Sequence, residues 1–147
     1  MERERPDRVL HLAGLNAAGR SWQEPAAYLE ANQMAAVYLL EAARKLALPA
    51  FRFVAAGSML RVDWPADGGP PAPPHPYSLS KTLQTAVIRS WHTLFGMDAI
   101  VAEPANLIGP GPSAGLCALI ANHLRAARRA AERGEPGPGP FRLSSAT

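Results

Sequence analysis

Three short apolar runs alternate with three longer stretches of helical periodicity, and this alternation restricts the possible folds more than any other feature of the chain. The apolar runs cover residues 8–14, 50–58 and 98–103, and each ends at or next to a glycine or a proline. Runs this short are typical of buried strands. Strands that alternate with helices indicate βαβ units, so we predict an α/β fold whose parallel sheet has helices on both faces.

The stretches of helical periodicity cover residues 25–48, 77–95 and 113–133. Pro25 suits a first helical turn, Pro49 ends the first stretch and Gly96 caps the second. The apolar positions that should face the core of the second helix are Leu79, Leu83, Ala86, Val87, Ser90 and Leu94. Residues 15–24 and the proline-rich residues 63–76 are predicted to be loops.

Composition and charge exclude several classes of protein. A single cysteine, Cys117, excludes an internal disulfide, and no apolar run approaches the roughly 20 residues of a membrane span. The charged first residues lack a signal-peptide core, so we expect a cytoplasmic protein without a membrane partner. The four histidines lack metal-ligand spacing, so we expect no metal site. The basic cluster in the third helix indicates a solvated face rather than a nucleic-acid patch; its members are Arg125, Arg128, Arg129 and Arg133.

Tyr77 and Lys81 are the residues with the clearest catalytic spacing. They lie four positions apart at the start of the second helix, so both side chains share one face, one turn apart. A nearby ammonium stabilises a phenolate, which suits a general acid or base acting on a hydroxyl or a carbonyl. Ser58, at the end of the second strand, is placed to donate a hydrogen bond to the reacting oxygen. We therefore predict Tyr77, Lys81 and Ser58 as catalytic residues.

Four segments, in order, resemble the extended short-chain dehydrogenase/reductase superfamily. Residues 9–14 resemble its V-x-H-L-A-A strand, and residues 28–43 resemble its Y-x-x-x-N…N-L-L-E-A helix. Residues 75–81 resemble x-P-Y-x-x-S-K, and residues 103–111 resemble R-P-x-N-x-Y-G-P-G. Within the superfamily the chain is similar to the NAD-dependent epimerase/dehydratase family, in particular to GDP-mannose 4,6-dehydratase-like deoxysugar enzymes.

The resemblance implies a function and a set of roles. It implies an NAD- or NADP-dependent enzyme that transfers a hydride on a nucleotide-sugar, with Tyr77 as the acid/base and Lys81 on the nicotinamide ribose. Asn106 would face the nucleotide-sugar substrate. The residues implied to bind the cofactor are Leu12, Ala13, Gly14, Asn32, Tyr77, Lys81, Pro104 and Ala105. The implied domains are a partial Rossmann-like cofactor domain over 1–112 and the start of a truncated substrate-binding lobe over 113–147.

Departures from the family pattern qualify these roles. The chain begins at what corresponds to the family's fourth strand, so we expect an N-terminally truncated fold without its first strands and its glycine-rich phosphate loop. The family's hydroxyl-bearing position aligns with Gly57, which leaves Ser58 as an adjacent substitute. Met59 stands where dehydratases carry a proton-abstracting glutamate, and a thioether cannot take up a proton.

The missing half should also affect stability and partners. An uncovered edge and face should expose residues around Val9, Leu10, Phe53 and Val54, so we expect a marginally stable, association-prone chain. The resemblance implies a homodimer that forms through the helices over 32–48 and 77–95. Two alternatives stay open: a catalytically dead remnant that pairs with an intact relative through these helices, or an unrelated small α/β binding module.

Overall fold

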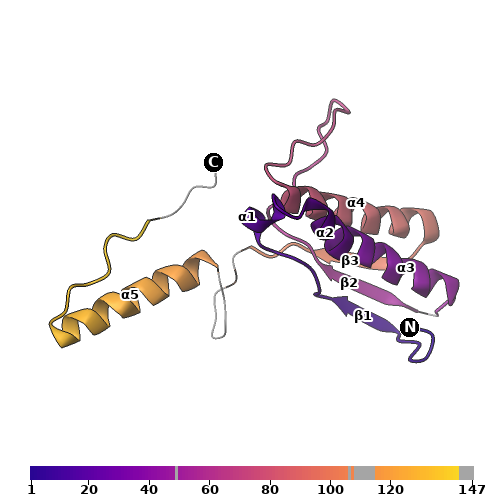
Figure 1. Ribbon diagram of the computed structural model, residues 1–147. Coiled ribbons are helices and arrows are strands. Elements are labelled where there is room, and N and C mark those ends of the chain that lie inside the picture. Colours follow the sequence, from indigo (N-terminus) through magenta and orange to yellow (C-terminus); the bar gives the residue numbers. More distant parts are fainter. Residues whose placement is uncertain (49, 106, 108–114, 143–147) are drawn as a thin grey trace. The chain divides into compact units, whose positions relative to one another are not determined.

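The computed structural model describes residues 1–48, 50–105, 107 and 115–142 (Figure 1). The chain divides into two compact units, Met1–Pro104 and Ala105–Thr147. The domain boundary predicted after residue 112 falls outside the described residues, so it stays a prediction. Most of the predicted site residues lie in the first unit.

The first unit is a three-stranded parallel sheet with helices between its strands. Its strands have the order β1-β2-β3, which confirms the predicted α/β class. In this register His11 lies beside Ala55 and Ala56 lies beside Ala102, so the strands end at one edge. The elements in chain order are β1 (Arg8–His11), α1 (Ala18–Ser21), α2 (Pro25–Tyr28), η1 (Leu29–Met34), α3 (Ala35–Lys45), β2 (Arg52–Ala56), α4 (Pro76–Phe95) and β3 (Asp98–Ala102).

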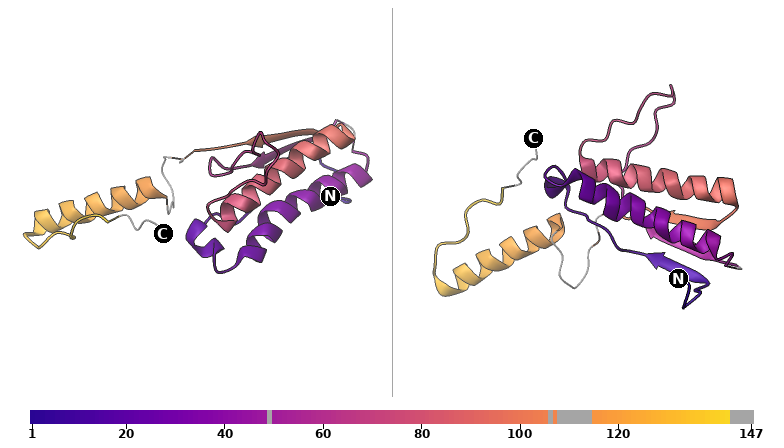
Figure 2. Two further views of the ribbon diagram at one scale, coloured as in Figure 1. Left: turned by 90° about the horizontal axis from the view of Figure 1, so that it is seen from above. Right: turned by 45° about the vertical axis from the view of Figure 1, so that its right-hand side comes forward.

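The helices of the first unit cover one face of the sheet, where α3 and α4 run side by side (Figure 2). The strand order advances in a single direction, and right-handed crossovers then place both connections on the same side. Within the described part of this unit, no helix or strand lies on the opposite face. The prediction of helices on both faces is therefore wrong for this unit, because the sequence pattern does not contain the order of the strands.

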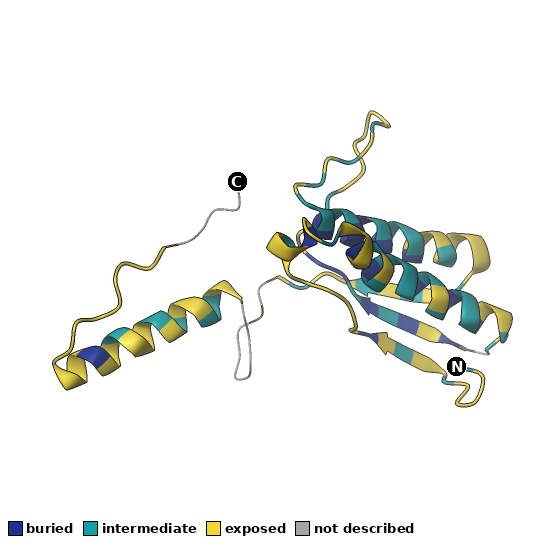
Figure 3. Cartoon of the chain, in the orientation of Figure 1, coloured by how far each residue is buried: buried dark blue, intermediate teal, exposed yellow. Residues whose placement is uncertain are grey.

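Burial alternates from residue to residue along β2, as a cover on one face of the sheet requires (Figure 3). Phe53 and Ala55 face the helices and are fully buried, whereas Leu10 and Ile100 are 65% and 49% exposed on the bare face. The predicted exposure is confirmed for Leu10 and wrong for Phe53. The reason is the two-residue period of a strand, which sends Phe53 to the covered face.

The hydrophobic core lies between the sheet, α3 and α4. Its buried members are Ala36, Leu40, Ala43, Phe51, Phe53, Ala55 and Ile88. The apolar stripe predicted for the second helix is wrong, since Leu94 is exposed and Leu79, Leu83 and Val87 are only half-buried. The face that α4 buries is mostly polar: Lys81 bonds to the end of β2, Ser78 and Thr82 bond to the loop after β2, and Ser80 bonds to Asn32. Its polar members are Ser78, Ser80, Lys81, Thr82, Gln84 and Thr85.

A π-helical segment interrupts the helix predicted over residues 25–48. This segment, η1, lies between α2 and α3, and its one fully buried side chain is Asn32. A π-helical turn closes its hydrogen bonds over five residues, so it adds a residue to the α-helical spacing. Apolar periodicity predicts helix of either kind, which is why the sequence indicated one continuous element. The short helix α1 lies within residues 15–24, which the sequence predicted to be loop.

The second unit contains one helix in its described part, α5 (Leu116–Arg133). The helix ends at Gly134, whose φ of 66° is left-handed, and Glu135 donates its N–H to the carbonyl oxygen of Ala130 at 2.9 Å. Glycine at this position is a common helix terminator. No helix among the described residues is long and apolar enough to cross a membrane.

Matched leucine truncations test the one-sided burial. Leu40→Ala removes a fully buried side chain and should lower the free energy of unfolding by about 2–5 kcal/mol. Leu10→Ala makes the same chemical change at a site that is 65% exposed, and should change it by no more than about 0.5 kcal/mol. Urea denaturation of both variants checks this. A large loss in Leu10→Ala would show that the bare face is covered in solution.

Candidate functional site

The carboxyl ends of the three strands form one edge, and the segments that follow them carry most of the predicted site residues. In an open parallel sheet this edge is where ligands bind. Residues 12–15 follow β1, residues 57–62 follow β2, and Glu103 and Pro104 follow β3. The helical elements η1 and α4 pack on each other beside this edge.

Asn32, which belongs to η1, connects the loop after β1 with α4. Its Oδ1 atom accepts the N–H of Leu15 at 2.9 Å. Its Nδ2 group donates to the carbonyl oxygen of Leu15 at 2.9 Å and to Oγ of Ser80 at 2.8 Å. Ser80 in turn donates its hydroxyl to the carbonyl oxygen of Tyr77 at 2.8 Å. The buried amide of Asn32 therefore fixes the loop after β1 against the first turns of α4.

Gly14 lies directly against this network. A Cβ atom at Gly14 would lie 2.4 Å from Oδ1 of Asn32 and 3.8 Å from Nζ of Lys81, and the φ of Gly14 is +156°. Only a residue without a side chain allows the backbone to come this close. Leu12 and Ala13, which precede it, are exposed to solvent.

Lys81 is buried at the carboxyl end of β2. Its Nζ group donates to the carbonyl oxygen of Ala56 at 2.9 Å and to Oε1 of Gln84 at 3.0 Å. Burial lowers the pKa of the Lys81 ammonium below its ordinary value, because a charged group loses hydration inside the protein. The structure thus holds a positive charge beside the strand ends with neutral oxygen acceptors.

Tyr77 lies one helical turn before Lys81. The helix is capped by His75, whose Nδ1 atom accepts the N–H of Ser78 at 2.9 Å. The Tyr77 ring is buried next to the rings of His75 and Tyr28, at centroid distances of 5.9 Å and 6.2 Å. Among the described residues its hydroxyl has no hydrogen-bond partner, so the group is free to bond to a ligand.

Ser58 begins a loop that is tied to α4. Its Oγ atom accepts the N–H of Leu60 at 3.1 Å. Ser78 donates its hydroxyl to the carbonyl oxygen of Leu60 at 2.5 Å, and Thr82 Oγ1 accepts the N–H of Val62 at 3.0 Å. These bonds bring Ser58 to the same edge as the first turns of α4.

The same loop is also held to the end of β3. Arg61 forms ion pairs with Asp63 and Glu103, and these contacts raise its pKa. The N–H of Met59 donates to the carbonyl oxygen of Pro104 at 3.3 Å. Sequence reasoning assigned no role to Arg61, because a pair of residues 42 positions apart leaves no local pattern.

The structure brings most, but not all, of the predicted site residues together. Those at the carboxyl edge are Leu12, Ala13, Gly14, Asn32, Ser58, Tyr77, Lys81 and Pro104. Ala105 belongs to the second unit. Asn106, the predicted substrate-binding residue, lies outside the described residues.

Two buried residues at this edge were missed by sequence reasoning. His11 ends β1, its ring lies 5.9 Å from that of Phe53, and burial, followed by the charge of Lys81, lowers its pKa. Gln84 is fully buried and contacts Lys81. A signal existed for Gln84, since residues three apart on a helix share a face.

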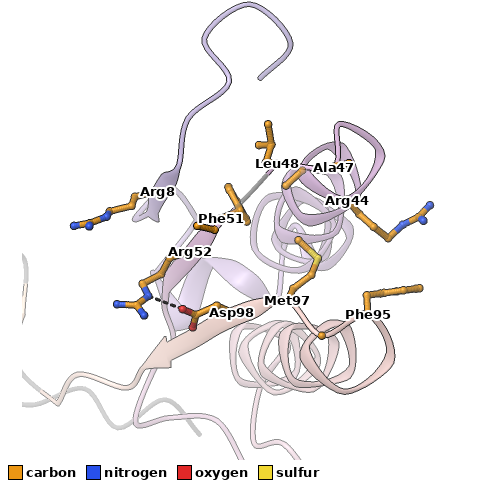
Figure 4. A pocket seen from close by; sticks show the side chains of 12 residues that line it. Arg8, Arg44, Ala47, Leu48, Phe51, Arg52, Phe95, Met97 and Asp98 are labelled. Atoms are coloured by element: carbon orange, nitrogen blue, oxygen red, sulfur yellow. Dashed lines mark hydrogen bonds and ion pairs between the residues drawn. The ribbon is translucent and has the colours of Figure 1, made fainter.

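A pocket of about 540 Å³ lies at the opposite end of the sheet (Figure 4). Leu48, Phe51 and Met97 line it, and at its edge Arg52 pairs with Asp98 at 2.7 Å. Its described lining contains no tyrosine, histidine or lysine. The pocket therefore lacks the tyrosine, histidine and lysine found at the carboxyl edge, and that edge is the candidate functional site.

Sequence comparisons find relatives over most of the chain. A profile of the NAD dependent epimerase/dehydratase family matches residues 1–140. A dTDP-glucose 4,6-dehydratase of Xanthomonas campestris is 30% identical over 123 residues, which cover 75% of this chain and 35% of that protein. A GDP-6-deoxy-D-mannose reductase of Pseudomonas aeruginosa is 30% identical over 114 residues, or 74% of this chain and 38% of that protein. The chain thus spans about a third of the length of these relatives.

Solved structures show the same fold. The structure of RMD from Pseudomonas aeruginosa complexed with NADPH matches with a TM-score of 0.70 and 26% identity, over 91% of this chain and 47% of that chain. A Thermus thermophilus UDP-glucose 4-epimerase in complex with NAD matches with a TM-score of 0.67 and 22% identity, over 92% and 44% of the two chains. These likenesses confirm the predicted partial Rossmann-like fold.

Two glycine substitutions test the close approach of the backbone to Asn32. Gly14→Ala places a methyl group against Oδ1 of Asn32, so it should lower the free energy of unfolding by about 1–3 kcal/mol. Gly19→Ala is the matched control. It lies in α1 with nothing within 4 Å of its Cβ position, and should be neutral or stabilising by up to about 1 kcal/mol. Equal effects of the two changes in chemical denaturation would contradict the packing at Gly14.

Proposed function

The chain belongs to the NAD-dependent epimerase/dehydratase family, and we propose that Tyr77, Lys81 and Ser58 form the proton-transfer part of a site for a nucleotide-sugar. The observation that carries the proposal is the position of Lys81. It is a buried lysine at the carboxyl end of β2, one helical turn after a tyrosine whose hydroxyl has no partner among the described residues. The reaction class is hydride transfer on the sugar, with NAD or NADP as cofactor.

The residues at the end of β1 fit the nicotinamide half of such a cofactor. Leu12, Ala13 and Gly14 are exposed, so a flat group can reach this backbone from solvent, while the missing side chain of Gly14 lets the segment pack against Asn32. Lys81 has a third N–H beyond its two hydrogen bonds, which suits a ribose hydroxyl. When bound, the nicotinamide accepts or donates a hydride at a sugar carbon. This sequence contains no G-x-x-G-x-x-G segment to hold the pyrophosphate.

Tyr77 exchanges a proton with the reacting sugar oxygen. In the oxidising direction its phenolate takes the hydroxyl proton, and in the reducing direction its phenol returns a proton to the carbonyl oxygen. The Lys81 ammonium and the N-terminus of α4 both stabilise the phenolate, since both are positive. Ser58 donates a hydrogen bond from its hydroxyl to the same sugar oxygen, while its Oγ accepts the N–H of Leu60.

Met59 bears on which reaction of the family this chain could catalyse. The resemblance implies a glutamate at this position in 4,6-dehydratases, and methionine has no ionisable group to take a proton from the sugar ring. We therefore favour epimerase or reductase chemistry over dehydration. Asn106 is proposed to contact the nucleotide-sugar, with Pro104 and Ala105 beside the nicotinamide.

The alternative is a catalytically dead remnant that pairs with an intact relative. Large exposed apolar side chains on α3 and α4 could form the pairing surface, including Tyr38, Leu94 and Phe95. The same surfaces would equally serve a homodimer, the partner implied by the family resemblance. The remnant would bind neither cofactor nor substrate by itself.

Thermal unfolding with and without NADH tests the proposed function. Ligand that binds only the folded state stabilises it by about 2.7 kcal/mol at one hundred times its Kd, so the midpoint of the wild-type chain should rise. Lys81→Met should remove this shift, because it deletes the amino group proposed to bind the ribose. Lys45→Met is the matched control and should keep it, since the Lys45 side chain is 70% exposed.

The other outcomes distinguish the two functions. A cooperative transition with no shift at saturating NADH, or a broad transition, would favour the remnant. Where turnover on a nucleotide-sugar is found, Tyr77→Phe should abolish it. Turnover that persists in Tyr77→Phe would contradict the assignment of this tyrosine as the acid/base.

A further inference from the structure

Lys81 is surrounded by neutral groups. Desolvation by burial accounts for the shift of its pKa, and among the described residues no carboxylate lies close enough to offset that loss. Two acids in the flanking segments have other partners: Glu103 pairs with Arg61, and Glu30 accepts the hydroxyl of Tyr38. The proton on Lys81 is therefore held by hydrogen bonds to two carbonyl oxygens, those of Ala56 and Gln84.

Among the described residues, the groups that face Lys81 include no carboxylate. From β1 the facing group is His11, whose own pKa is lowered by burial and by Lys81, so it is uncharged near neutrality. From α4 it is Tyr77, one turn earlier. The strand β2 contributes only backbone carbonyls, and η1 contributes the neutral amide of Asn32, which is bonded to Leu15 and Ser80.

Gln84 has no other hydrogen bond that explains its burial. Its side chain is fully buried, and its Oε1 atom accepts from Lys81 at 3.0 Å. Its Nε2 group has no partner among the described residues. Leaving a buried amide N–H unpaired is unfavourable. Among the described residues, the bond to Lys81 is therefore the only side-chain hydrogen bond that offsets the burial of Gln84.

We propose that Gln84 is a positioning residue for Lys81: its carbonyl oxygen keeps the ammonium at the carboxyl end of β2 and favours its protonated form. The backbone carbonyl of Ala56 fixes one direction of the amino group, and Gln84 fixes a second from the next turn of α4. The third N–H then points along a defined direction. This inference rests on the proposed function, which assigns Lys81 to the cofactor ribose and to Tyr77; Gln84 acts on both through Lys81.

The test is the pKa of Lys81, measured by NMR on the full chain without cofactor. The chain contains two lysines, Lys45 and Lys81, so ¹³C-lysine labelling gives two side-chain resonances, and Lys45→Arg assigns them. Gln84→Met keeps the size but removes the acceptor, and should lower the pKa of Lys81 by about one pH unit. Gln84→Glu supplies a charged acceptor and should raise it by about one to two pH units. Lys45 should titrate unchanged in both.

Thr85→Val is the matched control. Thr85 is buried in the same helical turn and its Oγ1 atom has no partner among the described residues, so the change removes a polar atom that does not contact Lys81. It should leave the pKa of Lys81 unchanged. If Gln84→Met unfolds the chain, Gln84→Glu still decides, because it preserves both size and acceptor.

A Lys81 titration that is the same in wild type and Gln84→Glu would overturn the proposal, as would equal shifts in Gln84→Met and Thr85→Val. No cofactor or substrate takes part in this measurement. Failure of NADH to bind would therefore count against the proposed function alone, and an unchanged Lys81 pKa would count against Gln84 alone.

Discussion

The buried ammonium of Lys81 is the constraint on which the arrangement of this edge depends. A positive charge removed from water needs acceptors, and here they come from the last carbonyl of β2 and from α4 itself. Meeting this need requires the face of α4 that carries Lys81 to turn inward. The helix buries serines, threonines and a glutamine, and leaves leucines at its partly exposed side, against the usual amphipathic rule.

Asn32 provides the second constraint, and it acts on backbone rather than on charge. Its amide connects the loop after β1 to Ser80, and Gly14 packs against it without a side chain. The π-helical segment turns Asn32 inward at the place where α-helical spacing alone would continue unbroken. Loop, helix and lysine are therefore positioned together, which is the kind of preorganisation that a proton-transfer site needs.

The fold and the site were predictable to different degrees. The strands and the main helices follow from local periodicity, and their predicted bounds lie within a few residues of the observed ones. The Tyr77–Lys81 pair follows from their spacing on one helix. The two helices on one face, the polar side of α4 and the π-helical segment were not predicted. Each depends on which elements become neighbours, and periodicity describes a single element at a time.

The sequence by itself determined the class of fold and the family. It also placed Tyr77 and Lys81 on one helical face, because side chains four residues apart lie one turn apart on a helix. Only the tertiary structure decided what surrounds them. Gln84 as the acceptor for Lys81, Arg61 as the link between the loop after β2 and Glu103, and the bare side of the sheet at Leu10 all arise from contacts between distant segments. Such contacts form when strand order and crossover handedness bring those segments together. Strand order and handedness cannot be predicted from a local stretch of sequence.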